Sequence, residues 1–356
     1  MNIHGGDVYR NRVDLDFSIN VNSLGVPREV EVALHNAVEL CGRYPDPESD
    51  RLKCAVSDLL AVPEEELLFG NGASELFMAV VHAIRPKKTL IPVPSFYGYE
   101  YAAKAADCEI VYYESGQENH FAIMDDICDM LTEEVDLLFL ANPNNPTGIL
   151  MHRETMGSLL EYCRDRGIYV VLDECFIEFC GSQFSMLPEI QSGAFDNLIL
   201  VRAFTKIFSI PGVRLGYLIC SDRQLVHRIR KQLPEWNLSC FAQEAGCVCA
   251  RQADFIRQTQ NYIRRERQFL TEGLRQKGYV VFPSMANFLL VYWGESAEMR
   301  GKTLYGILLK KGILIRDCSN FRGLGNGFYR IAVKTRAENE RLLRCCPQIG
   351  ACLQSP

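Results

Sequence analysis

Five short apolar segments in the first two thirds of the chain each run directly into polar or glycine-rich residues. They cover residues 67–69, 89–93, 137–141, 168–172 and 198–201, and longer segments with helical periodicity separate them. This alternation is typical of an α/β fold with a mostly parallel sheet. Because ligands bind at the carboxyl ends of the strands in such sheets, we expect the residues that follow these segments to form a site.

The last third of the chain has a different pattern. Helical periodicity dominates residues 224–277, and it is followed by four further apolar segments, at residues 279–282, 288–292, 313–316 and 329–333. Strands that follow a run of helices predict a smaller second lobe. We therefore expect an N-terminal arm over residues 1–28, a large domain over residues 29–238 and a small domain over residues 239–356.

The composition excludes several classes of protein. With 356 residues, 48% of them apolar and 23% charged, the chain resembles a globular enzyme rather than a disordered or fibrous protein. Its net charge of −6 gives no general affinity for nucleic acid or anionic membranes. No apolar run approaches the roughly 20 residues of a membrane helix, and residues 1–7 do not resemble a signal peptide. We expect a cytoplasmic protein without nucleic-acid or membrane partners.

Cysteine is frequent but shows no pattern of a functional site. The 15 cysteines are scattered and odd in number, and several, such as Cys128, Cys220 and Cys247, lie within apolar stretches. No Cys-x-x-Cys pair occurs. We interpret them as buried or incidental free thiols and predict no metal site.

The residues after the fifth apolar segment include a lysine in a distinctive setting. Lys206 follows Thr205 directly and precedes Arg214 by eight residues. An amine held at the end of a strand can condense with an aldehyde, while a hydroxyl and a guanidinium can bind a phosphate. Pyridoxal 5'-phosphate carries both groups. We therefore predict this cofactor, with Lys206 as a catalytic residue.

Three other strand ends suit the same cofactor. The first strand runs into the glycine turn 70–75 and then a helix, where unpaired N–H groups and the positive end of the helix dipole favour an anion. The third strand ends in the turn 142–148, Asn-Pro-Asn-Asn-Pro-Thr-Gly, in which the prolines and asparagines stop regular structure. The fourth ends in Asp173. A carboxylate, an amide and a phosphate-binding turn would then share one edge of the sheet.

Over essentially its whole length, the chain resembles the fold-type I pyridoxal phosphate enzymes, in particular their histidinol-phosphate aminotransferase-like branch. The turn 142–148 and the lysine segment 201–217 carry this resemblance. Within the branch it is most similar to the threonine-phosphate decarboxylases, on residues 4–6, 15–27, 43–46, 173–179 and 315–324. The resemblance implies a large domain with a mostly parallel seven-stranded sheet and a smaller α+β C-terminal domain.

The resemblance also implies cofactor contacts for single residues. Asp173 would pair with the protonated pyridine nitrogen and keep the ring cationic. Asn145 would bind the phenolic oxygen, and Phe96 would stack on the ring. Phe176 stands where many relatives carry a tyrosine that binds the phenolic oxygen. A phenylalanine at this position resembles the decarboxylases. Without the resemblance, the simpler interpretations are that Asp173 is a helix cap, Asn145 a turn residue and Phe96 a core aromatic.

The resemblance also implies which residues hold the cofactor phosphate. The residues implied are Gly72, Ala73, Ser74, Thr205 and Arg214. Tyr44 matches a tyrosine that reaches the phosphate bound by the partner subunit, so the resemblance implies a homodimer. The simpler interpretations are a plain glycine turn and an exposed surface tyrosine.

Substrate contacts follow from the same resemblance. Arg330 matches the arginine that binds the substrate carboxylate in a bidentate fork, which lysine could not reproduce. The residues implied for the substrate phosphate are His4, Asn20, Arg316 and Arg322. Arg322 lies in a loop, where arginines are more often solvated than functional.

The function implied is decarboxylation of O-phospho-L-threonine, or of a close relative such as phosphoserine, as in synthesis of the cobalamin nucleotide loop. An aminotransferase acting on histidinol phosphate or an aromatic amino acid is the alternative, because orientation of the substrate at Cα decides which bond breaks. A catalytically inactive cofactor-binding protein is a third possibility. Ala203 and Ser23 replace a hydroxyl residue and a proline that are common in the relatives, so substrate and rate can differ from theirs.

Overall fold

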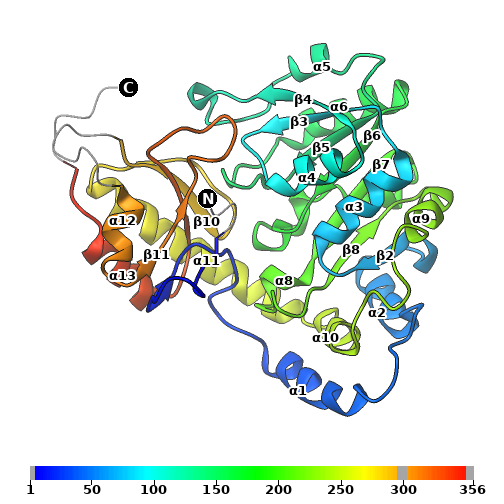
Figure 1. The fold of residues 1–356 in the computed structure, drawn as a ribbon, viewed down its shortest axis with the longest axis horizontal. Helices are drawn as coiled ribbons and strands as arrows, with labels where there is room; N and C mark the ends of the chain where they lie inside the picture. The colour runs from blue at the N-terminus through cyan, green and yellow to red at the C-terminus, as the bar shows by residue number, and fades with distance from the viewer. Residues whose placement is uncertain (1–4, 295–302, 350–356) are drawn as a thin grey trace.

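The computed structural model describes residues 5–294 and 303–349. The larger of two domains is built on a seven-stranded sheet (Figure 1). Within this sheet only β8 runs antiparallel to its neighbours, so the predicted mostly parallel sheet is confirmed. The strands lie in the order β2 (Leu67–Gly70), β8 (Gly216–Ile219), β7 (Leu198–Ala203), β6 (Tyr169–Asp173), β5 (Leu137–Ala141), β3 (Lys88–Val93) and β4 (Glu109–Glu114).

Helices cover both faces of this sheet. On one face pack α3 (Ala73–Ile84), α4 (Tyr97–Ala105) and α9 (Arg223–Arg230). On the other face pack α2 (Asp50–Leu60) and α6 (Arg153–Asp165). Since side chains alternate across a strand, burial of both faces requires the nearly continuous apolar runs seen in the sequence.

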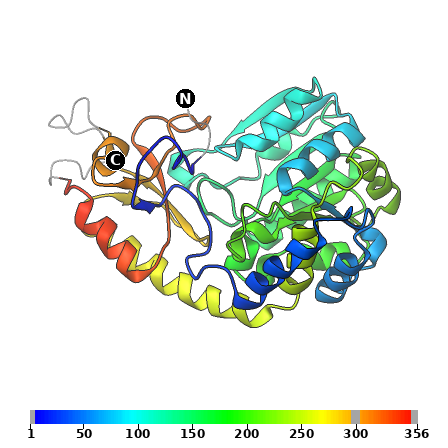
Figure 2. The same cartoon turned by 60° about the horizontal axis from the view of Figure 1, so that its bottom comes forward.

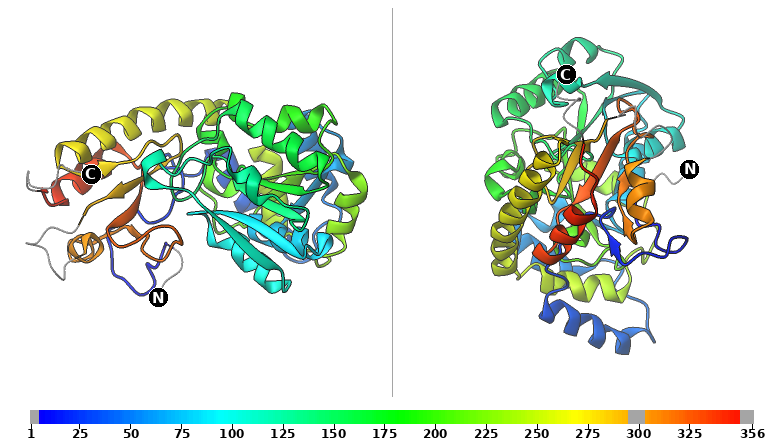
Figure 3. Two further views of the ribbon diagram at one scale, coloured as in Figure 1. Left: turned by 90° about the horizontal axis from the view of Figure 1, so that it is seen from above. Right: turned by 90° about the vertical axis from the view of Figure 1, so that its left-hand side faces the viewer.

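The smaller domain is an antiparallel sheet packed against helices. Its four strands lie in the order β12 (Arg316–Asp317), β13 (Phe328–Ala332), β10 (Phe288–Tyr292) and β9 (Val280–Val281). The long helix α11 (Ala253–Gln276) runs from the large domain along the small one, as Figure 3 shows in its left view. The smaller α+β domain implied by the resemblance is therefore present.

The N-terminal arm belongs structurally to the small domain. Its strand β1 (Leu15–Asp16) pairs in parallel with β11 (Ile313–Leu314). The chain then crosses to α1 (Arg28–Asn36), which packs against α10 (Cys240–Cys249) at the edge of the large domain (Figure 2). The arm thus passes between the two domains, although the predicted boundaries at residues 28 and 238 stay predictions.

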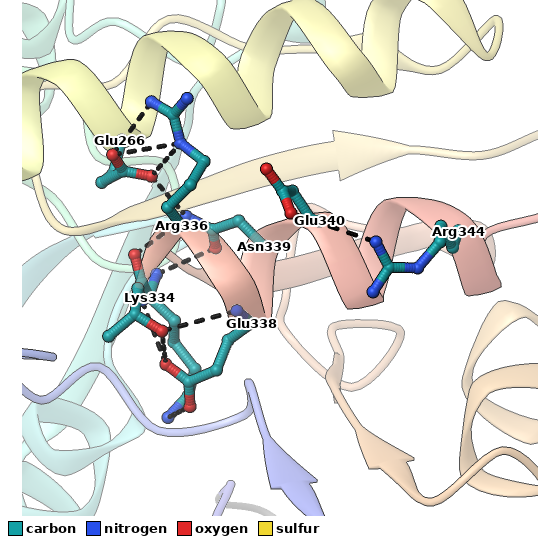
Figure 4. Close-up of polar contacts among 8 residues, drawn as sticks. Glu266, Lys334, Arg336, Glu338, Asn339, Glu340 and Arg344 are labelled. Carbon is teal, nitrogen blue, oxygen red and sulfur yellow. Dashed lines mark hydrogen bonds and ion pairs between the residues drawn. The ribbon is translucent and has the colours of Figure 1, made fainter.

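A buried carboxylate joins two helices of the small domain (Figure 4). Glu266 of α11 is 5% exposed and accepts hydrogen bonds from Arg336 and Asn339 of α13 (Arg336–Cys345). Thr335 and Glu338 form a capping box at the start of α13. These contacts fix the two helices against each other, and α11 also packs against β10, which pairs with the Arg330 strand β13.

Most predicted elements occur close to their expected positions. The five apolar segments of the large domain correspond to β2, β3, β5, β6 and β7, while β4 and β8 were not predicted. The cysteines within the described residues are free thiols. The remaining elements are short. These elements are α5 (Ile127–Met130), α7 (Leu187–Gln191), α8 (Phe204–Ile207), α12 (Leu304–Leu309), and the 3-10 helices Ala37–Leu40, Glu64–Glu66, Gln117–Asn119, Ile177–Phe179 and Ser182–Phe184.

Candidate active site

A cavity of about 400 Å³ lies where the carboxyl ends of the large sheet meet the N-terminal arm and the small domain. Most of the residues predicted from the sequence line it. These are Asn20, Ala73, Ser74, Phe96, Asn145, Asp173, Phe176, Thr205, Lys206, Arg214, Arg316 and Arg330. Residues that are up to 310 positions apart in the sequence therefore share one chamber, as expected for a site at the carboxyl ends of parallel strands.

Lys206 lies in α8, the short helix that directly follows β7. Burial lowers the pKa of the Lys206 ammonium to about 8, and the positive charges of Arg330 and Arg214 act in the same direction. The charge-free amine is the nucleophilic form of lysine. The reactive form of Lys206 is therefore far more populated near neutral pH than that of an ordinary lysine.

The lowered pKa of Lys206 predicts how cofactor uptake depends on pH. The rate at which the cofactor-free protein takes up pyridoxal phosphate should rise with pH and level off above about pH 8, because the neutral amine then dominates. An ordinary lysine would give a rise that continues to about pH 10. Stopped-flow absorbance measures this rate directly. An uptake rate that still increases above about pH 9.5, as for an ordinary lysine, would contradict the assigned environment of Lys206.

Asp173 ends β6, and its two carboxylate oxygens are held separately. The Tyr99 hydroxyl donates to Oδ2 at 2.6 Å, and the backbone N–H of Cys175 donates to Oδ1 at 2.8 Å. Burial raises the pKa of Asp173 above its ordinary value, and these hydrogen bonds offset part of that rise by favouring the charged form. The arrangement suits a carboxylate that must stay charged inside the protein in order to pair with a cation.

The turn before α3 forms a cradle with Arg214. Gly72 has a φ of +82°, and a Cβ built on it would lie 2.2 Å from Nη2 of Arg214, so only glycine lets the guanidinium approach the turn. α3 begins at Ala73, and its first turn presents unpaired N–H groups beside the guanidinium. Thr205 is 3% exposed and lines the same cavity. These residues fit a phosphate group.

The residues predicted to contact the cofactor ring also face the cavity. Oδ1 of Asn145 accepts a hydrogen bond from Nη1 of Arg330 at 2.5 Å, which leaves the amide N–H₂ of Asn145 to donate to a ligand oxygen. Phe176 is buried edge-on against Phe288, with a centroid separation of 5.1 Å, and offers no hydrogen bond. Phe96 lines the cavity as an aromatic wall. Together with Lys206 and Asp173, this set fits pyridoxal phosphate.

Arg330 projects from β13 and links the small domain to the large one. It is 7% exposed, and its Nη2 donates to the backbone oxygen of Ser18 at 2.9 Å. Burial lowers the pKa of Arg330 to about 10. Its Nε has no hydrogen-bond partner within the described residues. Because a buried guanidinium with an unsatisfied donor is costly, this position favours an anionic ligand.

Arg316 lies beside Arg330 on the neighbouring strand. The two residues are direct partners in the register of β12 and β13. Nη2 of Arg316 donates to Oδ1 of Asn320 at 2.8 Å, and its guanidinium lies 5.1 Å from the ring centroid of Phe321. Asn20 is 3% exposed, and its Oδ1 has no partner in the part of the chain that the structure describes. The cavity therefore contains two adjacent cations and an unsatisfied amide.

Three predicted residues lie elsewhere. Gly72 stands behind Arg214 and shapes the cradle without lining the cavity. Arg322 is exposed and stacks over Tyr112 at 4.0 Å, beyond the cavity wall. Tyr44 is 78% exposed and lies on the outer surface. His4 falls outside the described residues. The roles expected for these residues stay predictions.

Two groups that hydrogen-bond Asp173 were missed by sequence reasoning. Cys175 follows Asp173 by two residues, a spacing that allows the N–H of the strand end to cap its own carboxylate. Tyr99 gives no local signal, because its partner is 74 residues away. Phe77, Tyr97 and Phe321 also line the cavity and were not predicted.

Within residues 5–294 and 303–349, no group of three or more histidine, cysteine or acidic side chains is arranged to hold a metal ion. In those ranges, no helix has the length and apolar character that crossing a membrane requires.

Residues 12–345 match the profile of the family described as aminotransferase class I and II. The chain belongs to this family. It is 34% identical to the threonine-phosphate decarboxylase of Salmonella typhimurium, over 92% of this chain and 89% of that protein. It is 32% identical to the adenosylcobalamin biosynthesis bifunctional protein CobDQ of Leptospira interrogans, over 92% of this chain and 38% of that protein.

A solved member of the family has a closely similar structure. The histidinol-phosphate aminotransferase of Clostridium acetobutylicum aligns with a TM-score of 0.86 and 32% identity, covering 93% of this chain and 98% of that one. The predicted fold, the resemblance to threonine-phosphate decarboxylases and the pyridoxal phosphate cofactor are thus confirmed at the level of the family. The roles of single residues stay predictions.

Proposed function

We propose that this protein is a pyridoxal phosphate-dependent decarboxylase of a small phosphorylated amino acid, O-phospho-L-threonine or a close relative such as phosphoserine. The observation that carries the proposal is the cross-strand pair Arg316 and Arg330. Like charges placed directly opposite on a sheet destabilise it, and here both line one cavity. A substrate with a carboxylate and a phosphate a few atoms apart would relieve that repulsion at both positions.

The threonine-phosphate decarboxylase of Salmonella typhimurium supports the choice of substrate. The likeness to CobDQ supports a place in adenosylcobalamin synthesis, as the sequence predicts. Phe176 also supports a decarboxylase, because it removes the donor that many aminotransferases present to the phenolic oxygen. We retain a cytoplasmic location as part of the proposal.

The residues of the cavity suggest how the reaction would be directed. Bound pyridoxal phosphate supplies an aldehyde for the substrate amine and a ring that accepts the electron pair released at Cα. Arg330 would hold the carboxylate and Arg316 the phosphate, so the two anchors fix the rotation of the substrate about Cα. Decarboxylation requires the bond to the carboxylate to stand perpendicular to the ring. Nζ of Lys206 would then return a proton to Cα after carbon dioxide leaves.

The contacts with the cofactor can also be assigned to single residues. Asp173 would keep the ring nitrogen protonated, and the Gly72 turn with Arg214 would hold the phosphate of the cofactor. Asn145 would donate to the phenolic oxygen, while its own carbonyl oxygen fixes Arg330. Cofactor and substrate contacts are therefore linked through one hydrogen bond.

An aminotransferase is the second candidate. It is favoured by the structural likeness to the histidinol-phosphate aminotransferase of Clostridium acetobutylicum. One assay separates the two. With cofactor and O-phospho-L-threonine, the purified protein should release carbon dioxide without any added keto acid as amino acceptor. Formation of glutamate from 2-oxoglutarate, with no carbon dioxide, would overturn the proposal. A visible cofactor absorbance without turnover of any phosphorylated amino acid would favour an inactive binding protein.

We also propose a homodimer in which Tyr44 reaches the site of the partner subunit. Tyr44 is 78% exposed, and its ring lies 4.7 Å from that of Trp236, which is 43% exposed, at a tilt of 30°, beside a hollow of about 460 Å³. Two large exposed aromatic rings on one surface are typical of an interface. Light scattering should give twice the mass of the chain, and a monomer with full activity would contradict the assignment.

A further inference from the structure

Tyr99 occupies a position that packing alone does not explain. It lies in the first turns of α4 and is 1% exposed. Its ring stacks on Phe139 at 5.1 Å and meets the edges of Phe77 and Phe96 at 5.1 and 5.7 Å. A phenylalanine would satisfy all three contacts. The hydroxyl, however, reaches through this aromatic cluster to donate to Oδ2 of Asp173 at 2.6 Å.

The direction of this hydrogen bond is fixed by its surroundings. Burial raises the pKa of Tyr99 well above its ordinary value, and the charge of Asp173 raises it further. Tyr99 therefore stays a donor across the working pH range, and Asp173 stays the acceptor. Since the N–H of Cys175 donates to Oδ1, each carboxylate oxygen accepts at least one hydrogen bond. Two donors on different oxygens prevent the carboxylate from rotating about its Cβ–Cγ bond.

Tyr99 also touches the wall of the cavity that is expected to cover the cofactor ring. Phe96 lies three residues earlier, and a Cβ on the intervening Gly98 would lie 2.3 Å from Cε1 of Phe96. Gly98 therefore lets the Phe96 ring fold back over the start of α4, where it meets Tyr99. One tyrosine contacts both the carboxylate and the aromatic wall.

We infer that Tyr99 is a positioning residue, which aims the Asp173 carboxylate at the ring nitrogen of the cofactor and keeps it ionised. This inference rests on the proposed cofactor role of Asp173. A hydrogen bond to a carboxylate favours its charged form, so loss of the Tyr99 hydroxyl raises the pH below which Asp173 becomes neutral. Tyr99 thereby acts on cofactor affinity and on its pH dependence, rather than on the substrate.

The test is Tyr99→Phe, which keeps the ring and removes only the hydroxyl. The dissociation constant of pyridoxal phosphate is measured against pH by fluorescence quenching, without any substrate. We expect affinity near neutral pH to fall about tenfold, as for loss of a hydrogen bond to a charged group. The acid-side loss of affinity should also begin at a higher pH than in the unsubstituted protein.

Tyr113→Phe provides a matched control. Tyr113 is a buried tyrosine of β4 that donates to Oδ1 of Asp126, also at 2.6 Å, and it does not line the cavity. Its substitution should leave cofactor affinity and the pH profile unchanged. Unaltered affinity and profile in Tyr99→Phe would overturn the inference, and so would equal losses in both variants, which would indicate general destabilisation. If the unsubstituted protein bound no cofactor, the proposed function itself would fail.

Discussion

Lys206→Ala should abolish decarboxylation, with turnover falling by about 10⁴-fold or more. The variant loses the amine that reacts with the cofactor aldehyde and the proton donor nearest to the reacting carbon. No other lysine lines the cavity within the described residues. Added methylamine can replace the first function only weakly, because it is not held in place. Carbon dioxide release, measured with saturating cofactor, gives the rate.

Two further variants separate chemistry from folding in this experiment. Lys206→Arg keeps a positive charge in the cavity but supplies no nucleophilic amine, so it should be as inactive as Lys206→Ala. Lys104→Ala removes an exposed lysine of α4, paired with Glu100, and should retain full activity. More than about one hundredth of the normal rate in Lys206→Ala would show that the proton is delivered by another group.

Arg330→Ala should lower kcat/KM by roughly 10²- to 10³-fold, because losing one side of a buried charge pair costs about 2–5 kcal/mol. Two effects add here. The substrate carboxylate loses its anchor, and Asn145 loses the donor that orients it. If orientation at Cα decides the outcome, the residual reaction should also contain more transamination, detectable as pyridoxamine phosphate.

The size of the Arg330 effect can be judged against two other substitutions. Arg330→Lys keeps the charge but offers no planar fork for both Asn145 and Ser18, so it should recover only a small part of the loss. Arg344→Ala removes an exposed arginine of α13 in the same domain and should have no effect on kcat/KM. Equal kcat/KM for Arg330→Lys and the unsubstituted protein would exclude bidentate binding.

The sequence predicts the elements whose patterns are set by local burial. β3, β5, β6 and β7 are covered on both faces, so their apolar runs are nearly unbroken and were recognised. β4 lies at the sheet edge and begins and ends with exposed glutamates, which hides its strand pattern. Strands of that kind are set by pairing with a neighbour rather than by their own composition.

The residues of the site likewise differ in how far the sequence could predict them. Lys206, Asp173 and Arg214 could be predicted because they lie in segments whose residue order is typical of the family. Tyr99 could not, since its hydrogen bond to Asp173 depends on how α4 packs against β6. The cross-strand pairing of Arg316 with Arg330 depends on sheet register, which the sequence does not show directly. Contacts that depend on tertiary packing therefore required the structure.

The central claim is that the ε-amine of Lys206 binds the aldehyde of pyridoxal phosphate. The most direct measurement is borohydride reduction of the cofactor-loaded protein, followed by peptide mapping with mass spectrometry. We predict one modified peptide, with the reduced cofactor attached at Lys206. Attachment at a different lysine, or no attachment after reduction, would contradict the claim.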